Sequence, residues 1–116
     1  MNVTVLVDAS GSMSVLGKET ICESLIQTLT LLTKLNPSYK DWSFDFQNWD
    51  KDTRELKDSS EEKYIVLTDG FDIDSIDNRN VSVVLVGEDA PQVSKVNYFK
   101  VIDILNAVEF LRDNND

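Results

Sequence analysis

A length of 116 residues, 41% of them hydrophobic, fits one small globular domain, residues 1–116. The 21 acidic side chains outnumber the 11 basic ones, and the net charge of −10 disfavours binding to nucleic acids and to anionic membranes, which are negatively charged themselves. The absence of histidine excludes His-based triads and imidazole metal ligands, and a single cysteine, Cys22, excludes an internal disulfide.

The beginning of the sequence lacks the pattern of a signal peptide or a membrane span, because neither a basic start nor a long apolar run precedes Asp8. A lone cysteine suits a reducing compartment. Cys22 lies inside an apolar helical pattern, which favours a small buried side chain over a reactive thiol. We expect a cytoplasmic protein that is a monomer in isolation.

The first predicted element is a buried strand over Val3 to Val7, a run of mostly β-branched residues that stops at Asp8. The turn Ala9-Ser10-Gly11-Ser12 follows, with two serines at alternate positions. In an open α/β sheet, ligand sites form just past the carboxyl ends of the strands. Asp8, Ser10 and Ser12 are therefore candidate binding residues.

A helix is predicted over Lys18 to Leu35, where apolar residues recur at three- and four-residue spacing. Either Ser14 or Gly17 marks its start, and Asn36-Pro37 ends it. Several threonines in this stretch are weak helix formers, so packing against the rest of the domain has to supply much of the stability of the helix.

Alternating side chains in the stretch 42–49 predict a second strand that ends before Trp49, with aromatic residues facing the core and polar residues facing the other way. Trp49 is expected just past the strand, partly exposed at the rim of the site. The charged stretch 50–62 is expected to be a loop, with room for a short edge strand over Thr53 to Leu56.

The remaining sequence predicts further strands and a C-terminal helix. Tyr64 to Thr68 is a short apolar run that also ends in an aspartate and a glycine, Asp69-Gly70. After it follow an acidic, turn-rich segment (71–80), a buried strand (81–86), a loop (88–94), a short edge strand (98–101) and a helix with Asp103 as its N-cap. Together these elements predict an α/β, Rossmann-like fold with a mainly parallel central sheet and helices on its faces.

Two predicted strands thus end in an aspartate and a flexible turn, at Asp8 and at Asp69. The carboxyl ends of parallel strands meet at one edge of a sheet, so both carboxylates converge on Ser10 and Ser12 if the strands are neighbours. Carboxylate and hydroxyl oxygens around one point suit a hard cation such as Mg²⁺. The sequence therefore predicts a metal site formed by these four residues.

The stretches Asp8-Ala9-Ser10-Gly11-Ser12-Met13 and Leu67-Thr68-Asp69-Gly70 resemble the two motifs of the von Willebrand factor A-type (vWA) domain with its metal-ion-dependent adhesion site (MIDAS). The resemblance implies a compact intracellular vWA-like domain in which Ser10 and Ser12 coordinate Mg²⁺, Mn²⁺ or Ca²⁺ directly. Asp8 and Asp69 would act largely through water. Small intracellular members of the family often work beside AAA+ ATPases or in bacterial stress and defence systems.

The resemblance also implies a partner for this domain, a protein whose Asp or Glu carboxylate completes the coordination sphere of the metal. Neutral hydroxyl ligands leave the positive charge that such a carboxylate satisfies. The metal is then expected to bind weakly without that partner. The expected function is divalent-metal-dependent protein binding.

The chain departs from the family in two respects. The family usually supplies a threonine ligand from the loop before the Asp-Gly strand, and Thr53 is the only threonine in that region here. At least one of the usual helices has no counterpart in the sequence. Thr53 or another residue therefore has to replace that ligand, or the site lacks it.

Other functions fit the same residues less well. A degenerate vWA scaffold would keep the fold without a metal. A receiver- or phosphatase-like phosphoacceptor would use Asp69, with Lys100 as a late lysine, but it requires a second acid near the first strand, where Ser10 stands. The acidic segment after Gly70 lacks the glycine and final glutamate of an EF-hand loop. We expect no enzyme, because no pair of base and nucleophile is evident.

Overall fold

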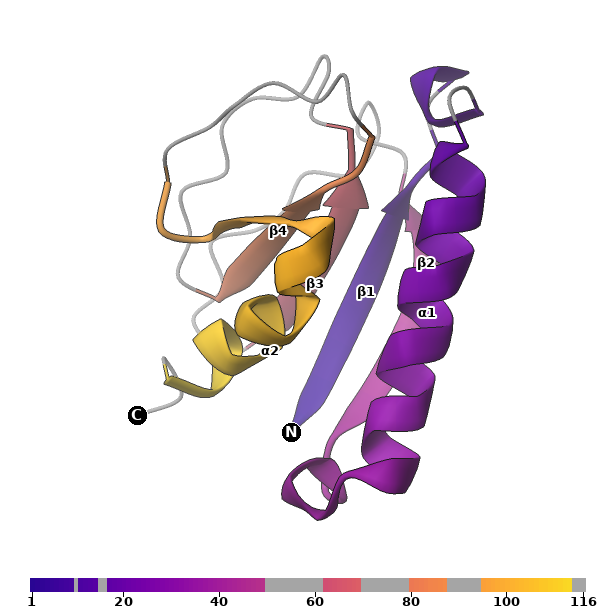
Figure 1. Cartoon of the computed structure of the whole chain (residues 1–116). Helices are drawn as coiled ribbons and strands as arrows, with labels where there is room; N and C mark the ends of the chain where they lie inside the picture. Colours follow the sequence, from indigo (N-terminus) through magenta and orange to yellow (C-terminus); the bar gives the residue numbers. More distant parts are fainter. Residues whose placement is uncertain (10, 15–16, 50–61, 70–79, 88–94, 114–116) are drawn as a thin grey trace.

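The computed structural model describes residues 1–9, 11–14, 17–49, 62–69, 80–87 and 95–113 (Figure 1). Within these ranges lie five strands, two α-helices and three short 3₁₀ helices. The strands are β1 (Asn2–Asp8), β2 (Ser43–Trp49), β3 (Lys63–Thr68), β4 (Val81–Leu85) and β5 (Tyr98–Lys100). The helices are α1 (Lys18–Leu35), α2 (Ile104–Asp113) and the 3₁₀ helices η1 (Gly11–Ser14), η2 (Pro37–Tyr39) and η3 (Val101–Asp103).

The five strands form one parallel sheet in the order β2-β1-β3-β4-β5. From β1 the chain passes to β2 at one edge, and the later strands are added on the other side of β1. The connection through α1 is right-handed, because in Figure 1 α1 lies in front of the upward-pointing strands and β2 lies to the right of β1. The predicted α/β, Rossmann-like fold with a parallel central sheet is confirmed, and β5 is the edge strand that was expected.

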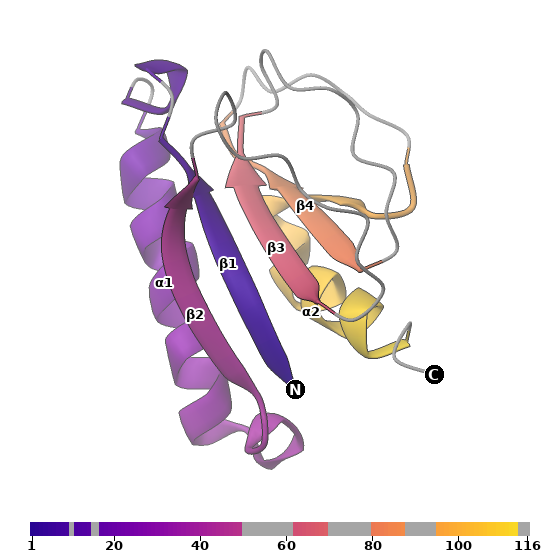
Figure 2. The same cartoon turned by 180° about the vertical axis from the view of Figure 1, so that it is seen from behind.

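Both α-helices pack on the same face of the sheet, as the opposite views in Figures 1 and 2 show. The buried residues of α1 recur at helical spacing, and from α2 Ala107, Val108 and Leu111 are completely buried. Burying one Leu or Val side chain contributes about 1.5–3 kcal/mol, so packing compensates for the weak helix formers in α1. Their main partners in the sheet are Val3, Val5, Ile65, Leu67 and Val84.

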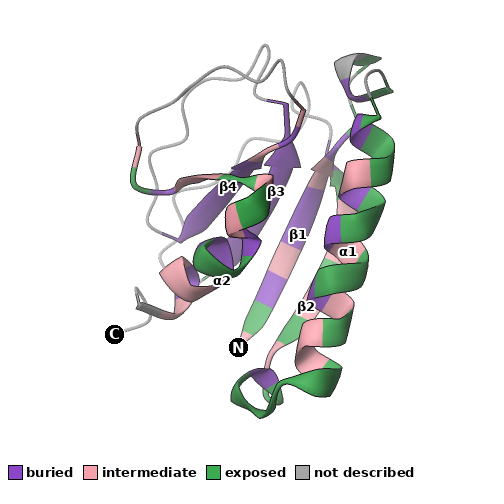
Figure 3. Cartoon of the chain, viewed as in Figure 1, coloured by how far each residue is buried: buried purple, intermediate pink, exposed green. Residues whose placement is uncertain are grey.

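The opposite face of the sheet carries a second core cluster, which neither α1 nor α2 covers. It consists of Leu6, Trp49, Tyr64, Val66, Val81 and Val83. Successive strand residues point to opposite faces, so Val5 packs under the helices while its neighbour Leu6 belongs to this cluster. Figure 3 shows β3 and β4 buried along nearly their whole length, as is typical of central parallel strands.

The predicted element boundaries agree closely with the structure. Helix α1 spans the predicted residues, with Gly17 as its N-cap residue and Asn36 as its C-cap residue. Each strand begins and ends within one residue of its prediction, and α2 begins directly after Asp103. The edge strand considered over Thr53 to Leu56 and the segment 71–79 lie outside the described residues. Neither described helix combines the length and the apolar character needed to cross a membrane.

The prediction for Trp49 is wrong. Trp49 is the last residue of β2 and is only 4% exposed. Strand β2 pairs with β1 along its full length, which places Trp49 beside Asp8, and the Ala9 N–H donates to the Trp49 carbonyl at 3.1 Å. The alternation of the strand directs the indole to the second cluster, where it packs with Leu6 and Val66.

Candidate functional site

The candidate site lies at the carboxyl ends of the neighbouring strands β1 and β3. From β1 the chain continues toward one edge of the sheet, and from β3 it continues toward the other edge. Ligands of open α/β sheets bind in the crevice outside such a switch point, including sheets with this strand order. The predicted condition for the site, that these two strands are neighbours, is therefore met.

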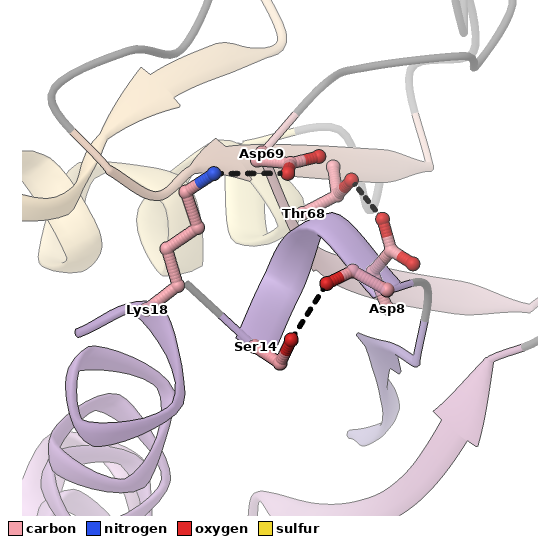
Figure 4. A network of polar contacts seen from close by, with 6 residues as sticks. Asp8, Ser14, Lys18, Thr68 and Asp69 are labelled. Carbon is pink, nitrogen blue, oxygen red and sulfur yellow. Dashed lines mark hydrogen bonds and ion pairs between the residues drawn. The ribbon is translucent and has the colours of Figure 1, made fainter. Parts of the chain in front are cut away.

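Asp8 closes β1 and is almost completely buried, at 3% exposure. The register aligns Val7 with Leu67, so the next residue of β3, Thr68, lies beside Asp8. The Thr68 hydroxyl Oγ1 donates to Asp8 Oδ2 at 2.6 Å, as Figure 4 shows. This bond ties the two strand ends together and fixes the orientation of the Asp8 carboxylate.

Asp69 follows β3 directly and is fully buried. Thr68 is the residue level with Asp8, and Asp69 stands one residue further along the chain, so the two aspartates are offset along the sheet. Residues one apart on a strand point to opposite faces, and Asp69 continues the side of Ile65 and Leu67, which is the side of the helices. The offset brings Asp69 within reach of α1.

The partner of Asp69 on α1 is Lys18, a residue that the sequence reasoning missed. Its ammonium Nζ donates to Asp69 Oδ2 at 3.1 Å, and both side chains have no exposed surface. Figure 4 shows the Lys18 side chain reaching from the start of α1 to the Asp69 carboxylate. A buried carboxylate is thus held by a buried ammonium at the edge where a metal was predicted.

Two sequence signals could have identified Lys18. It continues the buried stripe of α1, because Lys18, Cys22, Leu25 and Leu29 follow one another at four- and three-residue steps. It also stands in the first turn of the helix, where the helix dipole disfavours a cation. A lysine that opposes the dipole and lies on the apolar stripe is expected to have a buried anionic partner.

The serine loop is described only in part. Ser10, Gly70 and Thr53 lie outside the described residues, as does the side chain of Ser12, although Ser12 belongs to η1. The described serine of η1 is Ser14, whose hydroxyl donates to the Gly11 carbonyl at 2.7 Å. The structure brings Asp8 and Asp69 to one edge, and the roles of Ser10, Ser12 and Thr53 stay predictions.

The described side chains at this edge carry oxygen donor atoms, which are the kind that a hard cation prefers. Asp8 and Asp69 offer carboxylate oxygens, which Mg²⁺ and Mn²⁺ prefer, and serine hydroxyls are the further donors predicted from the sequence. Within the described ranges, no three Asp, Glu or Cys side chains gather into a metal-binding group. Asp8 and Asp69 carry the kind of oxygen donor that a divalent cation prefers, while the Lys18 ammonium on Asp69 is a feature that such a site does not require.

A cavity of about 410 Å³ opens beside Asp8, between α1 and the ends of β1 and β2. Its walls include the acidic residues Asp8, Glu19 and Glu23 and the thiol of Cys22. Burial, together with the negative charges of Asp8 and Glu19, raises the pKa of the Cys22 thiol to about 11. The carboxylates of Asp8, Glu19 and Glu23 make the potential in this cavity negative, which disfavours an incoming anion unless a cation offsets it.

The lysine considered for a phosphoacceptor, Lys100, is exposed at the end of β5, and the lysine that contacts Asp69 is Lys18.

The chain was also compared with models of known protein families, with curated proteins and with solved structures, and none of them matches.

Proposed function

We propose that this chain is a compact vWA-type domain that binds a partner protein in a manner that depends on a divalent cation. Asp8, Ser10, Ser12 and Asp69 would hold Mg²⁺ or Mn²⁺ at the carboxyl end of the sheet. When bound, the cation supplies the positive charge that accepts an Asp or Glu carboxylate of the partner. The chain itself positions the oxygen donors and keeps the two aspartates out of bulk water.

The observation that carries this proposal is the placement of Asp8 and Asp69. Both are buried, they terminate neighbouring parallel strands, and they lie at the switch point of the sheet. The Thr68 hydroxyl fixes Asp8, so at least one donor is pre-oriented. A buried carboxylate at a strand end is costly for folding alone, and binding is a reason to retain two of them.

The negative potential around the site supports a requirement for the cation. A partner carboxylate that approached the bare edge would meet Asp8, Glu19 and Glu23 around the neighbouring cavity. The net charge of −10 repels acidic partners in general. Binding of a carboxylate here without a metal is therefore disfavoured, and we expect a chelator to abolish binding of the partner.

Metal binding can be tested with Mn²⁺, a paramagnetic substitute for Mg²⁺, in nuclear magnetic resonance spectra of the whole chain. We expect Mn²⁺ to broaden the amide signals of Ala9 and Asp69, while those of Tyr64 and Val81 at the other end of the sheet stay sharp. The variant Ser10→Ala/Ser12→Ala is expected to lower Mg²⁺ affinity about tenfold or more. Ser14→Ala is the matched control, because Ser14 bonds only locally within η1.

Broadening that is absent or spread evenly over the chain would contradict the metal site. The protein-binding part of the proposal requires a separate measurement. A partner recovered from native lysate in Mg²⁺ has to dissociate in chelator and has to lose affinity for Asp8→Asn. Substitution of Asp and Glu residues in the partner then identifies the carboxylate that contacts the metal. A partner that stays bound in chelator would contradict the metal-dependent mode.

The ion pair between Lys18 and Asp69 favours a second candidate, a vWA-like scaffold that binds its partner without a metal. In that case the ammonium already neutralises Asp69, and Asp8 is satisfied in part by Thr68. Isothermal titration of the wild-type chain with Mg²⁺ separates the two candidates. The absence of binding at millimolar Mg²⁺, with the partner still captured, would establish the scaffold.

A further inference from the structure

We propose that the Lys18 ammonium is an internal counter-cation of Asp69 that a divalent metal has to displace, so that Lys18 sets the metal affinity of the site. This inference rests on the proposed metal-binding function and adds the residue that regulates it. Without metal, Lys18 and Asp69 hold the first turn of α1 against the end of β3. With metal, the lysine leaves Asp69.

The geometry supports direct competition between the two cations. Lys18 Nζ lies 3.1 Å from Asp69 Oδ2, which is contact distance, and neither side chain has any exposed surface. Like charges repel strongly in such a buried setting because little water screens them. A divalent cation held at Asp69 and an ammonium on the same carboxylate are therefore not expected to coexist.

The position of Lys18 in the helix argues that the contact with Asp69 is the reason for its burial. A cation in the first turn of α1 is unfavourable with respect to the helix dipole, and an ammonium on the buried stripe is costly to desolvate. Both costs are offset by the Asp69 carboxylate. Binding of a metal to Asp69 removes this compensation, which favours a change in the placement of Lys18.

The other buried lysine of the described chain provides an internal control. Lys63, at the start of β3, is 7% exposed and donates to Asn80 Oδ1 at 2.6 Å. It lies at the amino end of the sheet, on the opposite side from Asp69. A metal at the carboxyl end is therefore expected to change Lys18 and to leave Lys63 unchanged.

The first test measures the affinity of the whole chain for Mg²⁺ by isothermal titration. We expect Lys18→Met to bind Mg²⁺ about tenfold tighter than wild type or more, because the competing charge is gone. Lys63→Met is the matched control and is expected to bind as wild type does. Equal or weaker binding by a folded Lys18→Met would overturn the inference.

The second test uses wild-type protein and so does not depend on a variant that folds. Lysine acetylation followed by mass spectrometry reports the accessibility of each ammonium. We expect Lys18 to react slowly without metal and several-fold faster in saturating Mg²⁺, with Lys63 unchanged. If Mg²⁺ binds and the rate at Lys18 does not change, the inference is wrong while the metal site stands. If neither wild type nor Lys18→Met binds Mg²⁺, the proposed function falls, and the inference with it.

Discussion

The two buried lysines of the described chain lie at opposite ends of the sheet and have different partners. At the carboxyl end Lys18 contacts a carboxylate, Asp69, which comes from another element. At the amino end Lys63 donates to a neutral amide oxygen, that of Asn80, which stands directly before the neighbouring strand β4. Both contacts join separate elements, and the first places two full opposite charges in the interior.

The difference indicates what each end of the sheet does. At the amino end, Asn80 accepts from Lys63 through its side-chain oxygen and from the Tyr64 N–H through its carbonyl at 2.9 Å, and both bonds join β3 to the start of β4. A buried ion pair contributes little net stability, because desolvation cancels much of the attraction. The carboxyl end therefore retains charges that packing alone does not require, which is typical of a binding site.

The largest effect is expected when the carboxylate at the carboxyl end is removed. Asp69→Leu is expected to lower the free energy of unfolding by about 3–5 kcal/mol, because it removes the anion that Lys18 contacts in the interior. The double variant Lys18→Met/Asp69→Leu is expected to recover most of that loss. Urea denaturation measures both. A double variant no more stable than Asp69→Leu would show that the charge pair is not the source of the loss.

A smaller effect is expected at the amino end. Lys63→Met is expected to lower the free energy of unfolding by about 1–3 kcal/mol, because it leaves the buried Asn80 amide oxygen without its ammonium donor. The same urea titration applies, and the loss is expected to be equal with and without Mg²⁺. A loss as large as that of Asp69→Leu would mean that the two ends are energetically alike.

Thr68→Val tests the hydrogen bond that orients Asp8. The expected loss is about 1–2 kcal/mol, since valine keeps the volume of threonine and removes only the hydroxyl donor to Asp8. Weaker Mg²⁺ binding should accompany the loss. Thr20→Val, at an exposed position of α1, is the control and is expected to stay within about 0.5 kcal/mol of wild type. Unchanged stability in Thr68→Val would rule out a structural role for this bond.

The smallest effect concerns Cys22, which reports on the potential at the carboxyl end. Its pKa of about 11 lies above the ordinary value of 9.0, so its contribution to stability is fully present below pH 9 and is lost as the pH rises toward 11. We expect slow reaction with a thiol reagent near neutral pH until the chain is unfolded. Asp8→Asn is expected to lower the pKa of Cys22, and Lys63→Met to leave it unchanged. Rapid labelling of the native protein would contradict the burial of Cys22.

The sequence was sufficient to predict the fold because its signals are local. The apolar spacing of α1, the stop at Asn36-Pro37 and the alternation over β2 each depend on a short stretch of chain. The neighbouring position of β1 and β3 was only a condition of the predicted site, and the structure meets it. Trp49 was misjudged because β2 pairs with β1 as far as Trp49, and the alternation of the strand then directs the indole into the second cluster.

The site was predicted less completely than the fold because it depends on contacts between distant residues. The alignment of Asp8 with Thr68, and not with Asp69, follows from the pairing register, which no local pattern gives. The contact of Lys18 with Asp69 spans 51 residues. A lysine at the start of a helix is ordinarily solvated, so only the register and the helix placement together reveal its partner.

The order of strands in the sheet also affects when the site forms during synthesis. The bond between Thr68 and Asp8 spans 60 residues, so β1 and the serine loop leave the ribosome long before β3. At about 5–20 residues per second, roughly 3–12 s separate the two ends of this bond. Nascent chains that stop before β3 hold Asp8 and Lys18 but lack Thr68 and Asp69, so the two contacts that organise this edge can form only after residue 69 has been added.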